Sequence, residues 1–236
     1  MERTSRFPLS RECQSDMMRQ ALAICGKDIR SELRTRYALN ALIMFIIVVI
    51  SVIKFSLGEE KLSPDILAGL LWIIIFFSNS SGLARVFVSE EERETSLFLK
   101  LVSKPSSILF GKLVFNTSLS YFINIINVIL FIVATEFTIN SPGLFILTIL
   151  FGNLGMSAVM TIIAALISKA NTKGTLYPVL SFPLLLPLLL AVIDASKLSA
   201  EGTTFDQVSG DFQIMVSYTI VVITASFLIF DIVWND

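Results

Sequence analysis

Six long apolar stretches follow one another along the chain, with short polar segments between them. They cover about residues 38–57, 66–88, 107–136, 143–167, 175–194 and 213–233. Each is close to or above the roughly 20 residues that a helix needs to cross the hydrocarbon core of a bilayer. A soluble core of this size would instead show amphipathic periods broken by polar loops. The pattern predicts an all-α membrane protein with six transmembrane helices.

Residues 1–37 precede the membrane domain of residues 38–236, and their pattern predicts an amphipathic helix from about residue 15 onward. Apolar residues recur there at helical spacing, at Leu22, Cys25, Ile29 and Leu33. The polar face is basic and stands immediately before a span, so we expect the helix to lie along the cytoplasmic membrane surface. The alternative is a solvated helix that packs on a partner.

A short helix is also predicted at about residues 90–104, between the second and third spans. Ser89 and Glu92 have the spacing of a capping box, and the acidic residues after Ser89 complement the positive end of a helix dipole. Leu97, Phe98 and Leu101 fall on one face, and Pro105 ends the helix before the third span. This apolar face either packs on the chain's own bundle or contacts a cytoplasmic partner.

The third span carries a polar face. It consists of Asn116, Ser120, Asn124 and Asn127, which are spaced four, four and three residues apart. Amides at this depth should not face lipid, because an unsatisfied donor is costly there. The face indicates contact with another helix, with a second copy of the chain or with a polar substrate path. Pairing between helices is the most common of these arrangements.

The fifth span contains three prolines, Pro178, Pro183 and Pro187, within a leucine-rich sequence. Each removes a backbone donor and tends to kink a helix, so the span is predicted to bend, either as a hinge or as fixed shape. After it, the polar residues between 195 and 212 predict the largest outer element of the protein, a loop in which a small re-entrant or surface helix is one option.

Composition and charge narrow the function classes. Of the 236 residues, 54% are hydrophobic and 16% are charged, and the net charge of −1 gives no reason to expect nucleic acid as a partner. The chain has no histidine, so it supplies no imidazole to bind haem iron or zinc. No catalytic pair or metal motif lies within the spans. We therefore expect a non-catalytic subunit without a cofactor or metal of its own.

Basic residues predict the orientation. They gather before the first span, between the second and third spans, and between the fourth and fifth, whereas the other side has only Lys54, Lys61 and Lys197. Cytoplasmic loops retain Lys and Arg near helix ends, so both termini are expected in the cytoplasm of a bacterial inner-membrane protein.

Several segments together resemble one family, the CcmB permease subunit of the haem exporter used in c-type cytochrome maturation. This family belongs to the ABC-2 type permeases. The matching segments are residues 28–40, 62–72, 85–97, 101–105, 111–113 and 178–187, in the family's order. One departure is Glu94-Thr95-Ser96, where family members often have a glycine.

The resemblance implies an N-terminal elbow helix and a coupling helix over residues 90–104 that docks on a CcmA-like ATPase. The residues assigned to this contact are Glu90, Glu91, Glu92, Arg93, Glu94, Leu97, Phe98, Leu101 and Pro105. ATP and Mg²⁺ would bind the ATPase, and haem would be handled by the complex. Further implied partners are CcmC-like and CcmD-like membrane subunits, a CcmE-like haem chaperone and a second permease copy.

The implied function is to couple ATP hydrolysis to haem export or to release of the haem-loaded chaperone. Two alternatives remain open from the residues. The chain could be an ABC-2 exporter permease for lipid, polysaccharide or drug, or a membrane assembly scaffold without a transport role.

Overall fold

The computed structural model describes residues 9–34, 37–58, 62–84, 104–168 and 173–235, and each element in these ranges is an α-helix. The helices are α1 (Leu9–Arg34), α2 (Tyr37–Leu57), α3 (Pro64–Leu83), α6 (Pro105–Thr135), α7 (Pro142–Ile167), α8 (Lys173–Glu201) and α9 (Phe205–Asn235). Six of these seven helices, all but α1, are long and apolar enough to cross a membrane. The prediction of an all-α membrane protein with six spans is confirmed.

Proline fixes where three of the spans begin. Pro64, Pro105 and Pro142 each occupy the first turn of their helix. Proline is favoured there because its missing N–H would have no partner within the helix and its φ is already helical. The end of α6 is equally sharp, since Glu136 takes a left-handed conformation with φ of 53°.

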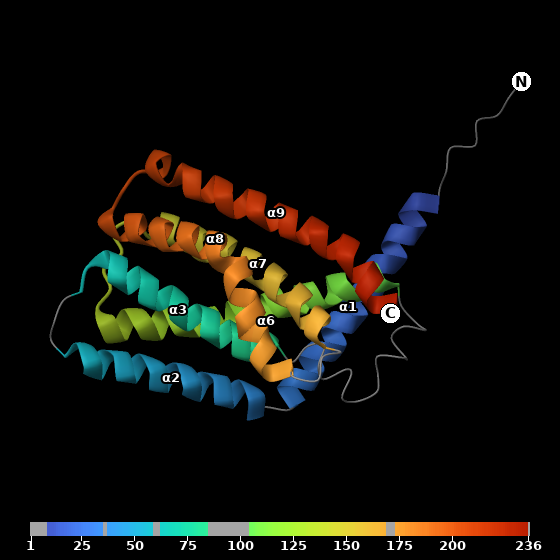
Figure 1. The fold of residues 1–236 in the computed structure, drawn as a ribbon, viewed down its shortest axis with the longest axis horizontal. Helices are drawn as coiled ribbons and strands as arrows, with labels where there is room; N and C mark the ends of the chain where they lie inside the picture. The colour runs from blue at the N-terminus through green and yellow to red at the C-terminus, as the bar shows by residue number, and fades with distance from the viewer. Residues whose placement is uncertain (1–8, 35–36, 59–61, 85–103, 169–172, 236) are drawn as a thin grey trace, which may run out of the picture.

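The spans form an elongated bundle with α3 and α7 at its centre. Figure 1 shows α2 at one edge and α9 at the opposite edge, with α3, α6, α7 and α8 between them. In α3 and α7, 67% of the residues in the most apolar window are buried, against 17% in α2. The central helices therefore carry the core, and α2 is a peripheral span.

Glycine on α7 lets its neighbours come close. A Cβ added at Gly152 would lie 2.6 Å from the ring of Trp72 on α3 and 2.6 Å from Val192 on α8. The fully buried Trp72 donates its indole Nε1–H to Ser196 Oγ at 2.8 Å, which ties α3 to α8 across this point. Small residues commonly permit such close contact between membrane helices.

The outer loop predicted over residues 195–212 is wrong. Helix α8 continues to Glu201 and α9 begins at Phe205, so only a short turn separates them, with Gly202 at φ of 84°. Charged residues of this segment, such as Lys197 and Glu201, therefore lie within α8 rather than in a loop. The turn is held by the α6–α7 connection, where the Ser141 N–H donates to Ser199 O at 2.9 Å.

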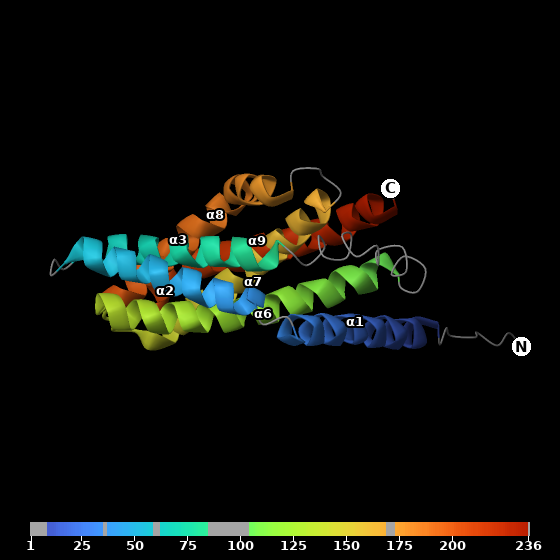
Figure 2. The same cartoon turned by 90° about the horizontal axis from the view of Figure 1, so that it is seen from below.

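Helix α8 changes direction along its length (Figure 1), and its first half stands away from the rest of the bundle in the turned view (Figure 2). The predicted kink residues Pro178, Pro183 and Pro187 all lie inside this helix. One stripe of this half, including Tyr177 and Leu185, is buried, and most of its other side chains are exposed.

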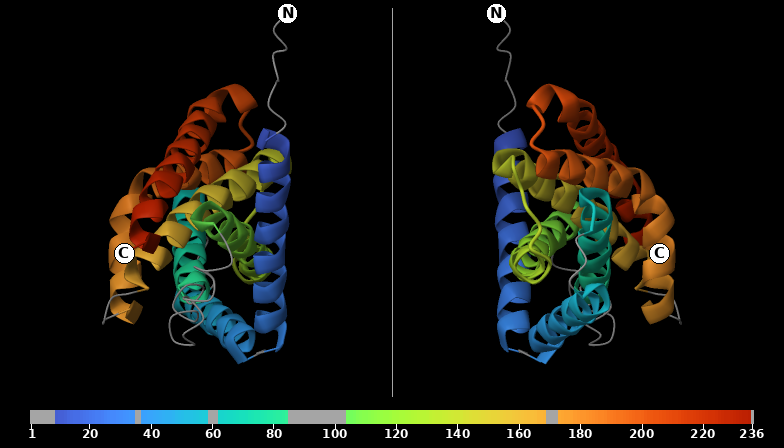
Figure 3. Two further views of the ribbon diagram at one scale, coloured as in Figure 1. Left: turned by 90° about the vertical axis from the view of Figure 1, so that its right-hand side faces the viewer. Right: turned by 90° about the vertical axis from the view of Figure 1, so that its left-hand side faces the viewer.

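Helix α1 packs mainly on α6 (Figure 2) and crosses beside it obliquely when seen along the bundle (Figure 3). Of the predicted apolar stripe, Cys25 is buried whereas Leu22 and Ile29 are exposed; the side chain of Leu33 lies outside the described residues. The face turned toward α6 is rotated from that stripe and consists of Ala21, Ile24, Cys25 and Asp28. The prediction that α1 lies on the membrane surface stays a prediction.

We predict that Gly152→Ala lowers the free energy of unfolding by about 1–3 kcal/mol, because the new methyl group must displace Trp72 or Val192. The melting midpoint of the purified protein in detergent measures this. Gly69→Ala in α3 is the matched control, since a Cβ there meets nothing within 4 Å. Equal midpoints for the two variants would contradict the packing argument.

Candidate functional site

The polar face of α6 points into the bundle. Asn116, Ser120, Asn124 and Asn127 are all essentially inaccessible to solvent, on the side of α6 that meets α3 and α7. Their spacing places them on one helix face, as the sequence indicates. The face is therefore part of the interior of this one chain.

Most of this face pairs with a matching polar stripe on α7. Asn116 Nδ2 donates to Thr161 Oγ1 at 2.9 Å, and the hydroxyls of Thr117 and Ser157 are 2.8 Å apart. One turn further along α6, Ser120 and Asn124 both donate to the side-chain oxygen of Asn153. We call these groups the α6–α7 polar seam. Its members are Asn116, Thr117, Ser120, Asn124, Asn153, Ser157 and Thr161.

Asn79 of α3 lies beside the seam, and Asn127 continues it along α6. Asn79 donates to the sulfur of Met156 at 3.2 Å, and Asn127 reaches Asn124 Oδ1 at 3.5 Å. Within the described residues, six buried atoms of the seam, of Asn127 and of α3 have no hydrogen-bond partner: Asn116 Oδ1, Asn153 Nδ2, Asn127 Oδ1, Ser78 Oγ, Asn79 Oδ1 and Ser80 Oγ. A buried polar atom without a partner costs about 1–3 kcal/mol. The centre of the bundle thus contains more hydrogen-bond donors and acceptors than its own side-chain contacts satisfy.

An apolar groove of about 560 Å³ lies on the surface of the α6–α7 helix pair. Tyr121 and Asn124 are the polar residues in its lining, and Tyr121 donates its hydroxyl to Leu150 O at 2.8 Å. The rest of the lining is mostly isoleucine and leucine. A polar substrate would find almost no hydrogen-bond partner there, so the groove is suited to hydrocarbon.

A buried ion pair joins α1 to α6. Lys112 Nζ lies 2.9 Å from Asp28 Oδ2, and the two side chains are only 1% and 10% exposed. A second cation, Lys27, is 3.6 Å from the other carboxylate oxygen. Next to the pair, Gly111 allows close contact, because a Cβ there would be 2.7 Å from the carbonyl oxygen of Ala21.

The residues assigned to the ATPase contact, from Glu90 to Leu101, lie outside the described residues, so their assignment stays a prediction. Pro105 is described and is the first residue of α6. Its place means that the segment assigned to the contact leads directly into the helix that carries the polar seam.

Sequence reasoning missed the partners of the polar face. Asn153 lies between glycines that indicate close packing on α7, and an amide inside a span was the signal that could have identified it. The ion pair between Asp28 and Lys112 was missed as well. Their pairing depends on tertiary contact between segments far apart in sequence.

A profile of the family described as CcmB protein matches residues 19–232, nearly the whole chain. The chain belongs to this family. A search of curated proteins finds no match. The CcmB family comprises permease subunits of the haem-exporter ABC transporter, and the matched range runs from α1 to α9. The resemblance inferred from the sequence is confirmed, and the chain is a multi-pass membrane protein.

We predict that Asn124→Leu and Asn153→Leu are non-additive in their effects on stability, with a coupling free energy of about 0.6–1.7 kcal/mol. Either change removes the hydrogen bond between the two amides, so the second change has less left to remove. Thermal unfolding of the two single variants and the double variant measures the coupling.

Ser118→Ala is the control for this cycle, because Ser118 is exposed on the same helix and bonds only within it, to Val114 O. Combined with Asn153→Leu, it should be additive. Additivity in the Asn124 and Asn153 cycle as well would contradict the pairing in the seam.

Proposed function

We propose that this CcmB-family chain couples ATP hydrolysis by a CcmA-like ATPase to haem export or to release of the haem-loaded chaperone CcmE. The observation that carries the proposal is the family match over residues 19–232. In this proposal the chain is a non-catalytic transmembrane subunit: it moves in response to nucleotide, and ATP and Mg²⁺ bind the ATPase.

The use of polar residues in the bundle supports a mechanical role. The α6–α7 polar seam holds two helices of one chain together, and side chains that pair in this way are engaged with protein rather than with a substrate. Haem ligands are expected on CcmC-like and CcmE-like partners, in keeping with the lack of histidine in this sequence. A CcmD-like subunit and a second permease copy complete the proposed assembly.

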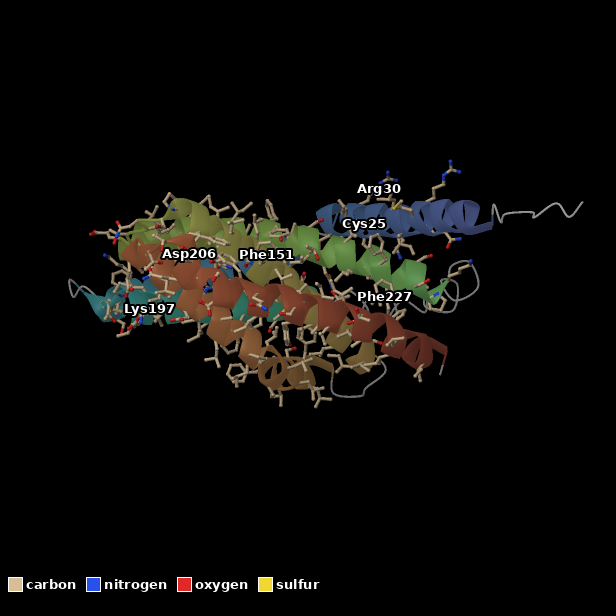
Figure 4. The ribbon with its side chains drawn as sticks, turned by 90° about the horizontal axis from the view of Figure 1, so that it is seen from above. Cys25, Arg30, Phe151, Lys197, Asp206 and Phe227 are labelled. Atoms are coloured by element: carbon tan, nitrogen blue, oxygen red, sulfur yellow. The ribbon has the colours of Figure 1, made fainter. Side chains whose placement is uncertain are left out.

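The distribution of charge supports both termini being in the cytoplasm, with the chain in a bacterial inner membrane. Helix α1 and the end of α9 lie at the same end of the bundle (Figure 1), and Arg19, Arg30 and Arg34 are exposed there. In Figure 4, Arg30 extends away from the bundle, whereas Lys197 and Asp206 lie at the opposite end. Basic residues favour the cytoplasmic side.

The segment at residues 90–104 is proposed as the contact with the ATPase, since it precedes α6 directly. Movement of this segment on ATP binding would act on the first turn of α6, and the seam would carry the displacement to α7. The ATPase need not reach the membrane interior itself.

We predict that Phe98→Asp or Leu101→Asp abolishes co-purification of the ATPase, because a carboxylate on the apolar contact face must be desolvated on binding. Pull-down of the ATPase with tagged permease from membranes measures this. The control is Phe205→Asp, an exposed phenylalanine at the opposite end of the bundle, which should leave the complex intact.

Retention of an active complex by both coupling variants would refute the assignment of residues 90–104. A transporter of lipid, polysaccharide or drug would also bind an ATPase, so co-purification does not separate that alternative. Neighbouring haem-lyase genes would favour haem handling, and loss of mature c-type cytochromes on deletion of the gene would exclude a role unrelated to them.

A further inference from the structure

The contact between α1 and α6 has two features that hold it in one position. The Asp28–Lys112 ion pair is buried, and a buried charge is tolerated only when its partner is well placed. The Gly111 contact is too close for any side chain, so it fixes how near the two helices lie. By contrast, the Asp65–Lys197 pair at the opposite end is exposed and can separate at little cost.

Helix α1 stands between two spans. It packs mainly on the first turns of α6, and it ends at Arg34, just before α2 begins at Tyr37. As the peripheral span, α2 has few buried residues of its own to resist displacement. Helix α2 also packs directly on α6, and a displacement of α6 that carries α1 with it reaches α2 through the chain connection as well.

We propose that the Asp28–Lys112 ion pair locks α1 to α6, so that both helices move as one body and pass movement of the third span to the first. This inference rests on the proposed function, because the ATPase supplies the movement. Asp28 and Lys112 are positioning residues in this scheme: they contact neither nucleotide nor haem. The ATP-driven displacement proposed to run from residues 90–104 through α6 to α7 therefore has a second branch, which runs from α6 through α1 to α2.

Cys25 provides a direct readout of the lock, because its thiol is buried in the face of α1 that packs on α6. Burial and the nearby Asp28 carboxylate raise the pKa of this thiol, so it is slow to react with a maleimide for two reasons. In a Cys13→Ser background, Cys25 is the remaining cysteine of the chain.

The variant for this readout is Lys112→Met, which removes the cation and leaves Asp28 in place. Loss of the positive charge does not itself lower the thiol pKa, so it gives no direct electrostatic reason for faster reaction, and we take faster reaction to report greater exposure of Cys25. We expect maleimide labelling of Cys25 in the assembled complex to accelerate about tenfold as the helices separate. Lys197→Met, which breaks the exposed pair, is the matched control and should leave the rate unchanged. An unchanged rate in Lys112→Met overturns the lock.

The coupling claim needs a second measurement, on complete complexes carrying Asp28→Asn, Lys112→Met or the charge exchange Asp28→Lys with Lys112→Asp. The single variants should keep the ATPase bound and hydrolysing ATP, while the yield of mature c-type cytochrome falls about tenfold. The exchange should restore both slow Cys25 labelling and cytochrome yield. A purely structural role would instead lower the amount of folded complex and ATP hydrolysis together.

The outcomes separate the inference from the function on which it rests. If the ATPase does not co-purify with the wild-type chain, the proposed function fails, whereas Cys25 labelling of the full-length chain in membranes still decides the lock. If the single variants keep full cytochrome yield, or if the exchange restores slow labelling without restoring yield, the coupling role is overturned. Fast labelling in the exchange variant contradicts the ion pair as the cause of the lock.

Discussion

The structure depends on one constraint, that polar groups inside a bilayer must find partners within the protein. The α6–α7 polar seam is where this chain meets it, since amides and hydroxyls of two neighbouring spans pair along several turns. Single pairs of this kind contribute little, about 0.6 kcal/mol on average in membranes. Together, however, these pairs fix the register between α6 and α7, because sliding one helix past the other would leave several buried groups without partners at once. The seam therefore fixes α6 and α7 as a unit, and the remaining helices pack around it.

The two ends of this unit are held differently. At the end away from α1, backbone and side-chain hydrogen bonds join the α6–α7 connection to the α8–α9 turn, as when Asn140 donates to Ala200 O at 2.8 Å. At the opposite end, a buried ion pair beside a glycine holds α1 on α6. The hydrogen bonds between the α6–α7 connection and the α8–α9 turn join short connections and so fix the ends of the helices. The ion pair instead ties down a whole helix that is attached to the bundle mainly at one face.

Hydropathy was enough to predict the six spans, because a run of apolar residues long enough to cross a bilayer has few alternative structures. The polar face of α6 was also predictable, since its spacing follows from helix geometry alone. Its partners Asn153 and Thr161 were not, because the sequence does not say which helices are neighbours. The loop expected at residues 195–212 was wrong for a related reason: Lys197 and Glu201 fit either a loop or a helix that projects from the membrane. The pairing of Asp28 with Lys112 likewise needed the fold.

Motion in such a protein must occur where few contacts are lost. The seam is a poor place for it, because separating α6 from α7 would expose several amides to lipid together. Helix α2 buries far less than α3 and α7, and the prolines of α8 have already removed hydrogen bonds that would resist bending. A cycle that moves α6 and α7 as one body, displaces the weakly held α2 and bends the first half of α8 leaves the costly contacts intact. The lock between α1 and α6 fits this division, because it enlarges the rigid body up to the residue at which the chain enters its most peripheral span.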